Sequence, residues 1–308
     1  MTDGMLLCIG DIDLDRMIAV ERLPAFDGKV SGRPLGDWPG GMAANVAMAA
    51  QRLGAPTRLL GLVGDDPAGG QVLAGLAGAG VDVSRCRSLA GCATFTSLVF
   101  LTDTGEKALV RVETPAFMPD PADITPDVMD GASYVHISYG SPALARAAVD
   151  RAAEAGVPVA MDLELADIPA HADALVRLLP RLDLLFVNRS MRAALDELWC
   201  PGENGPALVT TLGRDGARYE DGAQSLHAPG IAVTPKDTTG AGDCFAGAFL
   251  SARMAGAPVQ GALAFANAAA ALSTRAFGAQ AALPTRPEVD ALRARIAAAP
   301  PAAPSDNT

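Results

Sequence analysis

One loop indicates how this chain folds and what it binds: Asp237-Thr238-Thr239-Gly240-Ala241-Gly242-Asp243. An apolar run without proline follows it, so the loop is predicted to break directly into a helix. The first N–H groups of a helix have no intrahelical partner, and the helix dipole places partial positive charge there. Gly240, Ala241 and Gly242 are therefore predicted to form an anion site suited to phosphate.

Asp243 stands at the end of this loop and has two interpretations. A carboxylate beside a bound phosphate disfavours simple binding, because like charges repel. The same carboxylate would serve catalysis if it accepted the proton of a hydroxyl group that attacks phosphorus. Alternatively, Asp243 caps the helix after a glycine-rich turn and has no catalytic role. The loop by itself leaves both interpretations open.

Composition excludes several classes of protein. The chain has 308 residues, half of them apolar, which suffices for one large α/β domain or two small ones. Its formal charge of −11 argues against nucleic-acid binding, and an anionic nucleotide would need local attraction from backbone amides and a metal ion. The five cysteines show no zinc or redox spacing, and neither a signal peptide nor a membrane span is apparent. We therefore expect a cytoplasmic protein without nucleic-acid or membrane partners.

The N-terminal segment combines a buried strand with an acidic one. Residues 5–10 form a short apolar run, and Asp11, Asp13 and Asp15 follow at alternate positions. On a strand these three carboxylates share one face, where water, a metal ion or polyol hydroxyls must meet them. The alternative is a solvated edge strand.

Further along, strands and helices alternate. We expect strands at 59–63, 134–138, 157–161, 184–187, 207–211 and 217–220, and helices at 46–53, 69–79, 143–155, 175–179, 189–198 and 261–272. This alternation predicts a mostly parallel sheet with helices on both faces. Ligands bind beyond the carboxyl ends of such strands. Asp15, Asp162, Asn188, Thr211 and the 240–243 loop are therefore predicted to gather at one edge.

A second, smaller sheet is expected from two pairs of strands. Segments 16–38 and 94–112 each show a two-residue rhythm, and residues 102–106 carry the signal of a hairpin turn. These strands form either a lid over a site or an ordinary β-subdomain. The P-loop, the Gly-x-Gly-x-x-Gly fingerprint and the Gly-x-Ser-x-Gly elbow are all missing from the sequence.

Several ordered motifs resemble those of the ribokinase, or PfkB, family of carbohydrate kinases. The 237–243 loop resembles the C-terminal signature of that family, and Gly40-Gly41-Met42-Ala43-Ala44-Asn45 its N-terminal one. Segments 61–66, 211–216 and 278–280 resemble further family segments. The resemblance implies one ribokinase-like kinase domain over 1–299 with a β-sheet lid. Residues 300–308, rich in Pro, Ala and polar residues, are expected to be a disordered tail.

The resemblance also assigns roles to single residues. It implies an ATP-dependent sugar kinase with Asp243 as the base and Gly240, Ala241 and Gly242 as the anion hole. The sugar would be bound by Asp13, Asp15, Gly40, Gly41, Asn45 and Asp243. The nucleotide would be bound by Asn188, Thr211, Gly213, Gly216, Gly242 and Asn267, together with Mg²⁺. Asp237 would offer oxygen to a monovalent cation such as K⁺, and the lid would pair two subunits.

One departure from the family pattern leaves the function open. Where the family has Asn-x-x-Glu, this chain has Asn188-Arg189-Ser190-Met191, and a thioether is too soft to help organise Mg²⁺. The alternatives are a sugar- or nucleotide-binding protein with weak or no transfer, and a nucleoside kinase of the same family.

Two expectations concern the lid surface. Lys29, Arg33 and Arg111 lie on predicted lid strands, where they would meet an anionic acceptor or simply be solvated. Val99, Leu101, Leu109 and Val30 are expected on the outer face of the lid, where a two-fold dimer would bury them.

Overall fold

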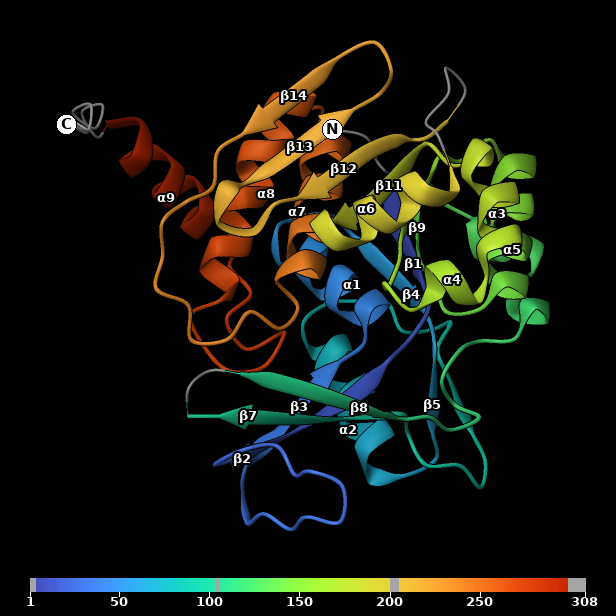
Figure 1. Cartoon of the computed structure of the whole chain (residues 1–308). Helices are drawn as coiled ribbons and strands as arrows, with labels where there is room; N and C mark the ends of the chain where they lie inside the picture. Colours follow the sequence, from blue (N-terminus) through green and yellow to red (C-terminus); the bar gives the residue numbers. More distant parts are fainter. Residues whose placement is uncertain (1–3, 104–105, 200–204, 299–308) are drawn as a thin grey trace, which may run out of the picture.

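The computed structural model describes residues 4–103, 106–199 and 205–298, and its centre is a large, mostly parallel sheet (Figure 1). The strands of this sheet run in the order β14-β13-β12-β11-β10-β9-β1-β4. They are β1 (Met5–Ile9), β4 (Thr57–Leu60), β9 (Ala132–Ser138), β10 (Val159–Asp162), β11 (Leu184–Asn188), β12 (Ala207–Thr211), β13 (Ala217–Glu220) and β14 (Ser225–Ala228). All neighbours from β4 to β12 pair in parallel, and only the β12–β13 and β13–β14 pairs are antiparallel.

Helices cover both faces of this sheet, because successive residues of its buried strands point to opposite sides. Leu6 and Cys8 of β1 pack with one set of helices, whereas Leu7 and Ile9 pack with the other. The first set is α1 (Met42–Arg52), α2 (Pro67–Gly78), α7 (Ala241–Met254), α8 (Val259–Ser273) and α9 (Arg286–Ala298). The second set is α3 (Pro142–Ala155), α4 (Asp167–Ala170), α5 (Ala172–Leu178) and α6 (Arg189–Leu198). The predicted fold class is therefore confirmed.

A separate four-stranded sheet stands off the main body (Figure 1). Its strands run in the order β3-β2-β7-β8, and we call it the lid sheet. They are β2 (Asp13–Val20), β3 (Gly32–Gly40), β7 (Thr96–Thr102) and β8 (Lys107–Val112). Both predicted strand pairs are thus present. The middle of the expected 102–106 turn and the 300–308 tail lie outside the described residues.

Several expected elements differ from those observed. The single strand expected at 59–63 is two strands: β4 belongs to the large sheet, while β5 (Leu62–Gly64) pairs with β6 (Arg87–Leu89). The chain changes sheets at Gly61, where a Cβ atom would lie 2.5 Å from the side chain of Ile12. Helix α1 begins four residues earlier than expected. β6, β14, α4 and α9 were not predicted, because short or polar segments give weak periodic signals.

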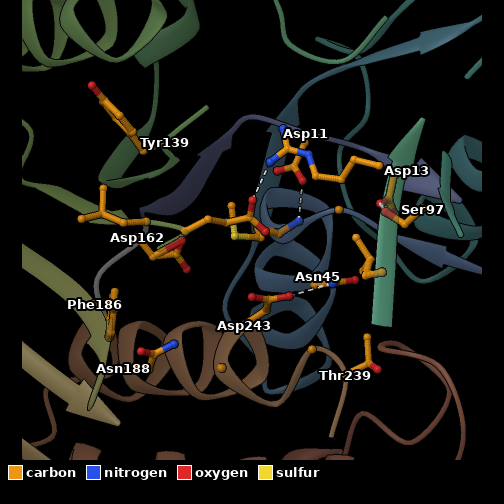
Figure 2. Close-up of a pocket in the computed structure, with 18 of the residues that line it drawn as sticks. Asp11, Asp13, Asn45, Ser97, Tyr139, Asp162, Phe186, Asn188, Thr239 and Asp243 are labelled. Carbon is orange, nitrogen blue, oxygen red and sulfur yellow. Dashed lines mark hydrogen bonds and ion pairs between the residues drawn. The ribbon is translucent and has the colours of Figure 1, made fainter. Parts of the chain in front are cut away.

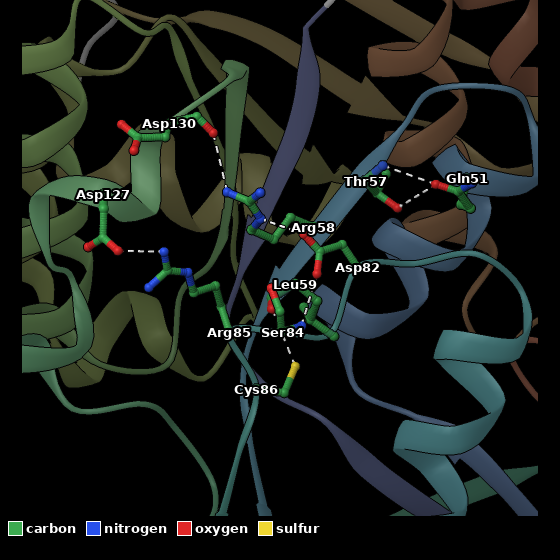
Figure 3. Close-up of polar contacts among 10 residues, drawn as sticks. All are labelled: Gln51, Thr57, Arg58, Leu59, Asp82, Ser84, Arg85, Cys86, Asp127 and Asp130. Carbon is green, nitrogen blue, oxygen red and sulfur yellow. Dashed lines mark hydrogen bonds and ion pairs between the residues drawn. The ribbon is translucent and has the colours of Figure 1, made fainter.

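Polar contacts fix the segments around β4 (Figure 3). The Gln51 side chain accepts hydrogen bonds from the Thr57 amide at 3.0 Å and its hydroxyl at 3.1 Å. Arg58 donates to the Asp82 carboxylate at 2.7 Å and to the Asp130 carbonyl at 3.2 Å. These bonds hold α1, β4 and the segment after α2 together.

In the described part of the chain, no helix is both long and apolar enough to cross a bilayer.

Candidate active site

Two cavities meet at the N-terminus of α7. The first has a volume of about 290 Å³, lies between the lid sheet and the main body, and is lined by six carboxylates: Asp11, Asp13, Asp15, Asp162, Glu164 and Asp243. The second has a volume of about 600 Å³, and its lining is mainly apolar and backbone. Thr211 and Gly242 line both cavities, so the start of α7 separates an acidic chamber from an apolar one. We call them the acidic cavity and the apolar cavity.

The start of α7 has the geometry of an anion site. Gly240 adopts φ +70°, and a Cβ atom there would lie 2.5 Å from that of Ala279, so only glycine fits this turn. The Ala241 amide is already used, since it donates to the Thr238 carbonyl at 3.2 Å. A Cβ atom on Gly242 would meet nothing within 4 Å, which leaves open space beside its amide. The amides of residues 242 and 243 are therefore the donors that face a ligand.

Asp243 projects from the first turn of α7 toward the acidic cavity (Figure 2). Its carboxylate accepts a hydrogen bond from Asn45 Nδ2 at 2.7 Å, and Gln280 Nε2 donates to Asn45 Oδ1 at 2.9 Å. Asn45 thus orients the carboxylate, a use of its amide that the sequence did not suggest. Burial, and next the neighbouring Asp162 carboxylate, raise the pKa of Asp243 well above its usual value. A carboxylate so placed accepts protons more readily than an exposed one.

The three N-terminal acids all line the acidic cavity, and all are buried, which rules out a solvated edge strand. Asp13 accepts a hydrogen bond from Ser97 Oγ at 2.7 Å, whereas its Oδ1 is buried without a protein partner among the described residues. Burial raises the pKa of Asp13 well above its usual value and that of Asp15 to about 6. Asp11 precedes β2 and accepts from the Met42 amide, the Ala43 amide and Ser138 Oγ.

The two glycines before α1 serve different purposes. Gly41 lines the acidic cavity and adopts φ +94°, and a Cβ atom there would lie 2.6 Å from the Asp11 carbonyl oxygen. Gly40 does not line the cavity. A Cβ atom on Gly40 would lie 2.0 Å from Asp13 Oδ1, so its absence makes room for that carboxylate.

Most of the predicted nucleotide residues line the apolar cavity, namely Thr211, Gly213, Gly216, Gly242 and Asn267. The Asn267 amide donates to the carbonyls of Ala228 and Pro229 at 2.9 and 3.1 Å, so it shapes the wall of the cavity. Asn188 lies instead on the acidic cavity, beside Met191. Its Oδ1 accepts from the Met191 amide at 2.9 Å and caps α6.

Asp237 lines neither cavity. Its carboxylate accepts hydrogen bonds from the Thr239 amide, the Thr239 hydroxyl and the Gly278 amide. Burial alone would raise its pKa, but these bonds outweigh that effect and lower it. Asp237 therefore ties the loop before α7 to the loop after α8, and its cation role stays a prediction.

A cluster around Arg111 was underestimated from the sequence. Its guanidinium lies 4.8 Å from the Phe117 ring centroid and donates to Glu164 Oε2 at 2.6 Å and to Glu113 Oε1 at 3.0 Å. Arg111, Phe117 and Glu164 all line the acidic cavity. Lys29 and Arg33 are exposed and do not line it, which favours the alternative that these two charges are solvated. No local motif marks Phe117 or Glu164, because only the fold brings them to Arg111.

Comparison with known proteins identifies the family of this chain. The profile of the pfkB family carbohydrate kinase matches residues 3–286. An ATP-dependent ribose-1-phosphate kinase of Halopiger xanaduensis is 34% identical over 295 residues, which is 94% of this chain and 97% of that protein.

Solved structures show the same fold. A ribokinase of Arabidopsis thaliana complexed with ribose and ATP has a TM-score of 0.78 and 25% identity, covering 94% of this chain and 98% of that one. A ribokinase II from E. coli, in complex with ATP and Mg²⁺, has a TM-score of 0.81 and 23% identity, covering 95% and 99%. This chain therefore belongs to the pfkB family of carbohydrate kinases, which are phosphotransferases.

Proposed function

We propose that this protein transfers the γ-phosphoryl group of ATP to a hydroxyl group of a sugar. The observation that carries the proposal is the position of Asp243, a partly buried carboxylate oriented by Asn45 where the acidic and apolar cavities meet. The sugar would occupy the acidic cavity, whose carboxylates accept hydrogen bonds from hydroxyls. The nucleotide would occupy the apolar cavity, with its phosphates directed at the start of α7.

In the proposed step, Asp243 takes the proton of the acceptor hydroxyl as that oxygen attacks the γ-phosphorus of ATP. The bond from phosphorus to the β–γ bridging oxygen breaks, and ADP leaves. The amides of Gly242 and Asp243 stabilise the charge on the transferred group. Asp13 and Asp15, which line the acidic cavity, bind other hydroxyls of the sugar. Because Asp243 must be ionised, its raised pKa predicts that turnover falls as the medium becomes acidic.

The residues present fit a Mg²⁺ ion that arrives on the nucleotide. Among the described residues, no group of three His, Cys, Asp or Glu side chains is arranged to hold a metal ion. The phosphates of ATP would supply its main ligands, and Asn188, on the wall of the acidic cavity, would contact its water shell. Bound there, the ion neutralises charge on the phosphates. A monovalent cation near Asp237 also remains part of the proposal.

The Asp243→Asn variant tests the role of the base. Asparagine keeps the size of the side chain but cannot accept the proton, so we expect kcat to fall by about 10²–10⁴-fold. ATP turnover would be measured on a panel of pentoses, ketoses and nucleosides, with ADP affinity determined by calorimetry as the check on folding. Nucleotide affinity should be retained. Unchanged turnover in the variant would refute the role of Asp243, and sugar binding without product in the wild type would favour a binding protein.

A second candidate acceptor is a sugar that carries an anionic group, as in the name of the Halopiger relative. Arg111 favours an anionic acceptor, because it is the only lysine or arginine among the described residues that line the acidic cavity. Its Nε atom is buried without a partner among those residues, while Nη1 donates to Glu164 and Nη2 to Glu113. A phosphate group on the acceptor would compete with Glu164 for the guanidinium.

Arg111→Gln and Glu164→Gln together distinguish the two acceptors. For ribose 1-phosphate, we expect Arg111→Gln to raise KM by about 10–100-fold, because a charge-assisted bond is lost. For ribose the change should be less than about threefold. Glu164→Gln releases the guanidinium and should lower KM for the phosphorylated sugar alone. Equal effects on both sugars would show that Arg111 only helps to hold the lid sheet.

A further inference from the structure

A histidine without a function in the proposed step lies beneath the acidic cavity. His136 is on β9 and is fully buried. Neither of its ring nitrogens has a hydrogen-bond partner among the described residues. The nearest polar group is Asp162, whose Oδ2 lies 3.4 Å from His136 Nε2. A buried imidazole with both nitrogens unpaired is costly to fold, so its presence calls for an explanation.

Asp162 connects this histidine to the cavity. It ends β10, is 8% exposed, and lines the acidic cavity together with Asp243 (Figure 2). Its Oδ1 is also buried without a hydrogen-bond partner among the described residues. The two carboxylates are close enough that Asp162 raises the pKa of Asp243. Asp11 and Asp15 act on Asp243 in the same direction, and Asn45 opposes them.

Among the described residues, β1, β10, α1 and α7 place no cation beside the pair. The strand register places Cys8 of β1 and Ala160 of β10 on either side of His136. Burial, and next Asp162, raise the pKa of the Cys8 thiol, which stays protonated. On β11 the Phe186 ring lies 6.3 Å from the imidazole. Helix α7 covers this face with Phe245, Phe249, Cys244 and Asp243, and the buried residues of α1 are apolar except Asn45.

We propose that His136 is a positioning residue that shares one proton with Asp162 and so keeps a net charge of zero next to Asp243. Because the pair holds one proton, it is neutral overall whether the proton is on nitrogen or on oxygen. With a neutral residue at 136, Asp162 would be an uncompensated buried anion. An uncompensated anion makes it harder for Asp243 to lose its own proton. The proposal rests on Asp243 as the base.

The pH profile of kcat/KM tests the proposal through four variants. In His136→Gln no proton on residue 136 compensates the negative charge of Asp162. The acid limb of the profile, where kcat/KM falls because Asp243 becomes protonated, should therefore move to higher pH by about half a unit or more. Asp162→Asn leaves an asparagine beside a neutral imidazole, again with no net charge, so the limb should stay close to that of the wild type. In the double variant the limb should coincide with that of Asp162→Asn, because the charge that His136 compensates is gone. His171→Gln is the matched control, since His171 does not line the cavity, and it should leave the limb in place.

A second measurement does not depend on turnover. The ¹⁵N chemical shifts of the His136 ring should show a protonated, ion-paired imidazole in the wild type at neutral pH, and a neutral one in Asp162→Asn. If these shifts appear while no sugar is phosphorylated, the proposed function fails and the proton-sharing pair stands. If the ring gives the same shifts in both proteins, or if His136→Gln lowers kcat without moving the acid limb, then His136 is only a packing residue and the proposal is wrong.

Discussion

The roles of single residues in this protein depend on partners far away in the sequence. Asp243 is oriented by Asn45, 198 positions earlier, and Asn45 is held in turn by Gln280. Such a chain of bonds aligns a carboxylate before any ligand arrives, which reduces the cost of ordering it during the reaction. Asn45 therefore contributes to the site even where it does not touch the sugar.

Met191 is the residue at which this chain departs from the family pattern. It stands in the first turn of α6, where its amide donates to Asn188 Oδ1 at 2.9 Å and its sulfur lies 3.5 Å from the Asn188 amide. A glutamate at this position would reproduce the same capping arrangement, so the helix should tolerate it. The side chain faces the acidic cavity, where the phosphates would meet it.

We expect Met191→Glu to lower the free Mg²⁺ concentration that gives half-maximal turnover. One added carboxylate near a hydrated ion should stabilise the bound ion by about 1 kcal/mol, which corresponds to an Mg²⁺ concentration lower by about fivefold. The measurement is turnover against free Mg²⁺ at constant ATP. Met191→Gln is the matched control, because it has the same shape without the charge and should behave like the wild type. If all three proteins need the same Mg²⁺ concentration, position 191 does not act on the ion.

At the scale of elements, the lid sheet separates two surfaces that the sequence could not assign. The register pairs Ser97 with Arg111 and Val99 with Leu109, and three of these four residues line the acidic cavity. Val99 is fully buried, and Leu109 faces the cavity. The expectation that Val99, Leu101 and Leu109 form the outer face is therefore wrong. The outer face comes from the alternate positions, Ile18, Leu98, Phe100, Val110 and Val112.

The lid sheet is also fixed to the body at more than one point. Arg111 of β8 pairs with Glu164, which follows β10, and Lys107 at the other end of β8 donates to the hydroxyl of Thr239. The ring of Trp38 on β3 lies against Gly278, where a Cβ atom would be 2.5 Å from it. These contacts hold the lid sheet against the loop before α7, beside the acidic cavity.

At the scale of the whole molecule, the outer face of the lid sheet supports the proposed homodimer. Val110 and Val112 on the edge strand β8 are 51% and 43% exposed, and they adjoin half-buried Leu98 and Phe100. Exposed edge strands with apolar side chains pair readily with another chain. A two-fold axis would bury this patch against its own copy.

We expect Val110→Lys to convert a dimer into a monomer in sedimentation, because a charge would be buried at the centre of the interface. Ile296→Lys is the matched control: this side chain is 46% exposed on α9 and lies outside the lid sheet. It should sediment like the wild type. A wild-type protein that is already monomeric at micromolar concentration would show that the lid acts without a partner subunit.

The sequence by itself determined the features that arise from local patterns. Alternating strands and helices predicted the parallel sheet, and the glycines before Asp243 predicted a helix that starts at an anion site. The same topology predicted that Asp15, Asp162, Asn188, Thr211 and the 240–243 loop would meet. All of these except Ala241 line the acidic cavity. The sheet and the helix start are confirmed, because strand direction and helix starts depend on neighbouring residues, whereas the anion site stays a prediction.

Only the tertiary structure decided which side chains meet across the fold. The pairing of Asn45 with Asp243, of Arg111 with Glu164 and of His136 with Asp162 joins residues on separate elements. The face of the lid on which Leu109 lies depends on strand register, and a shift of one residue would reverse it. Such contacts depend on packing over long sequence separations, and no local pattern in a single sequence encodes them.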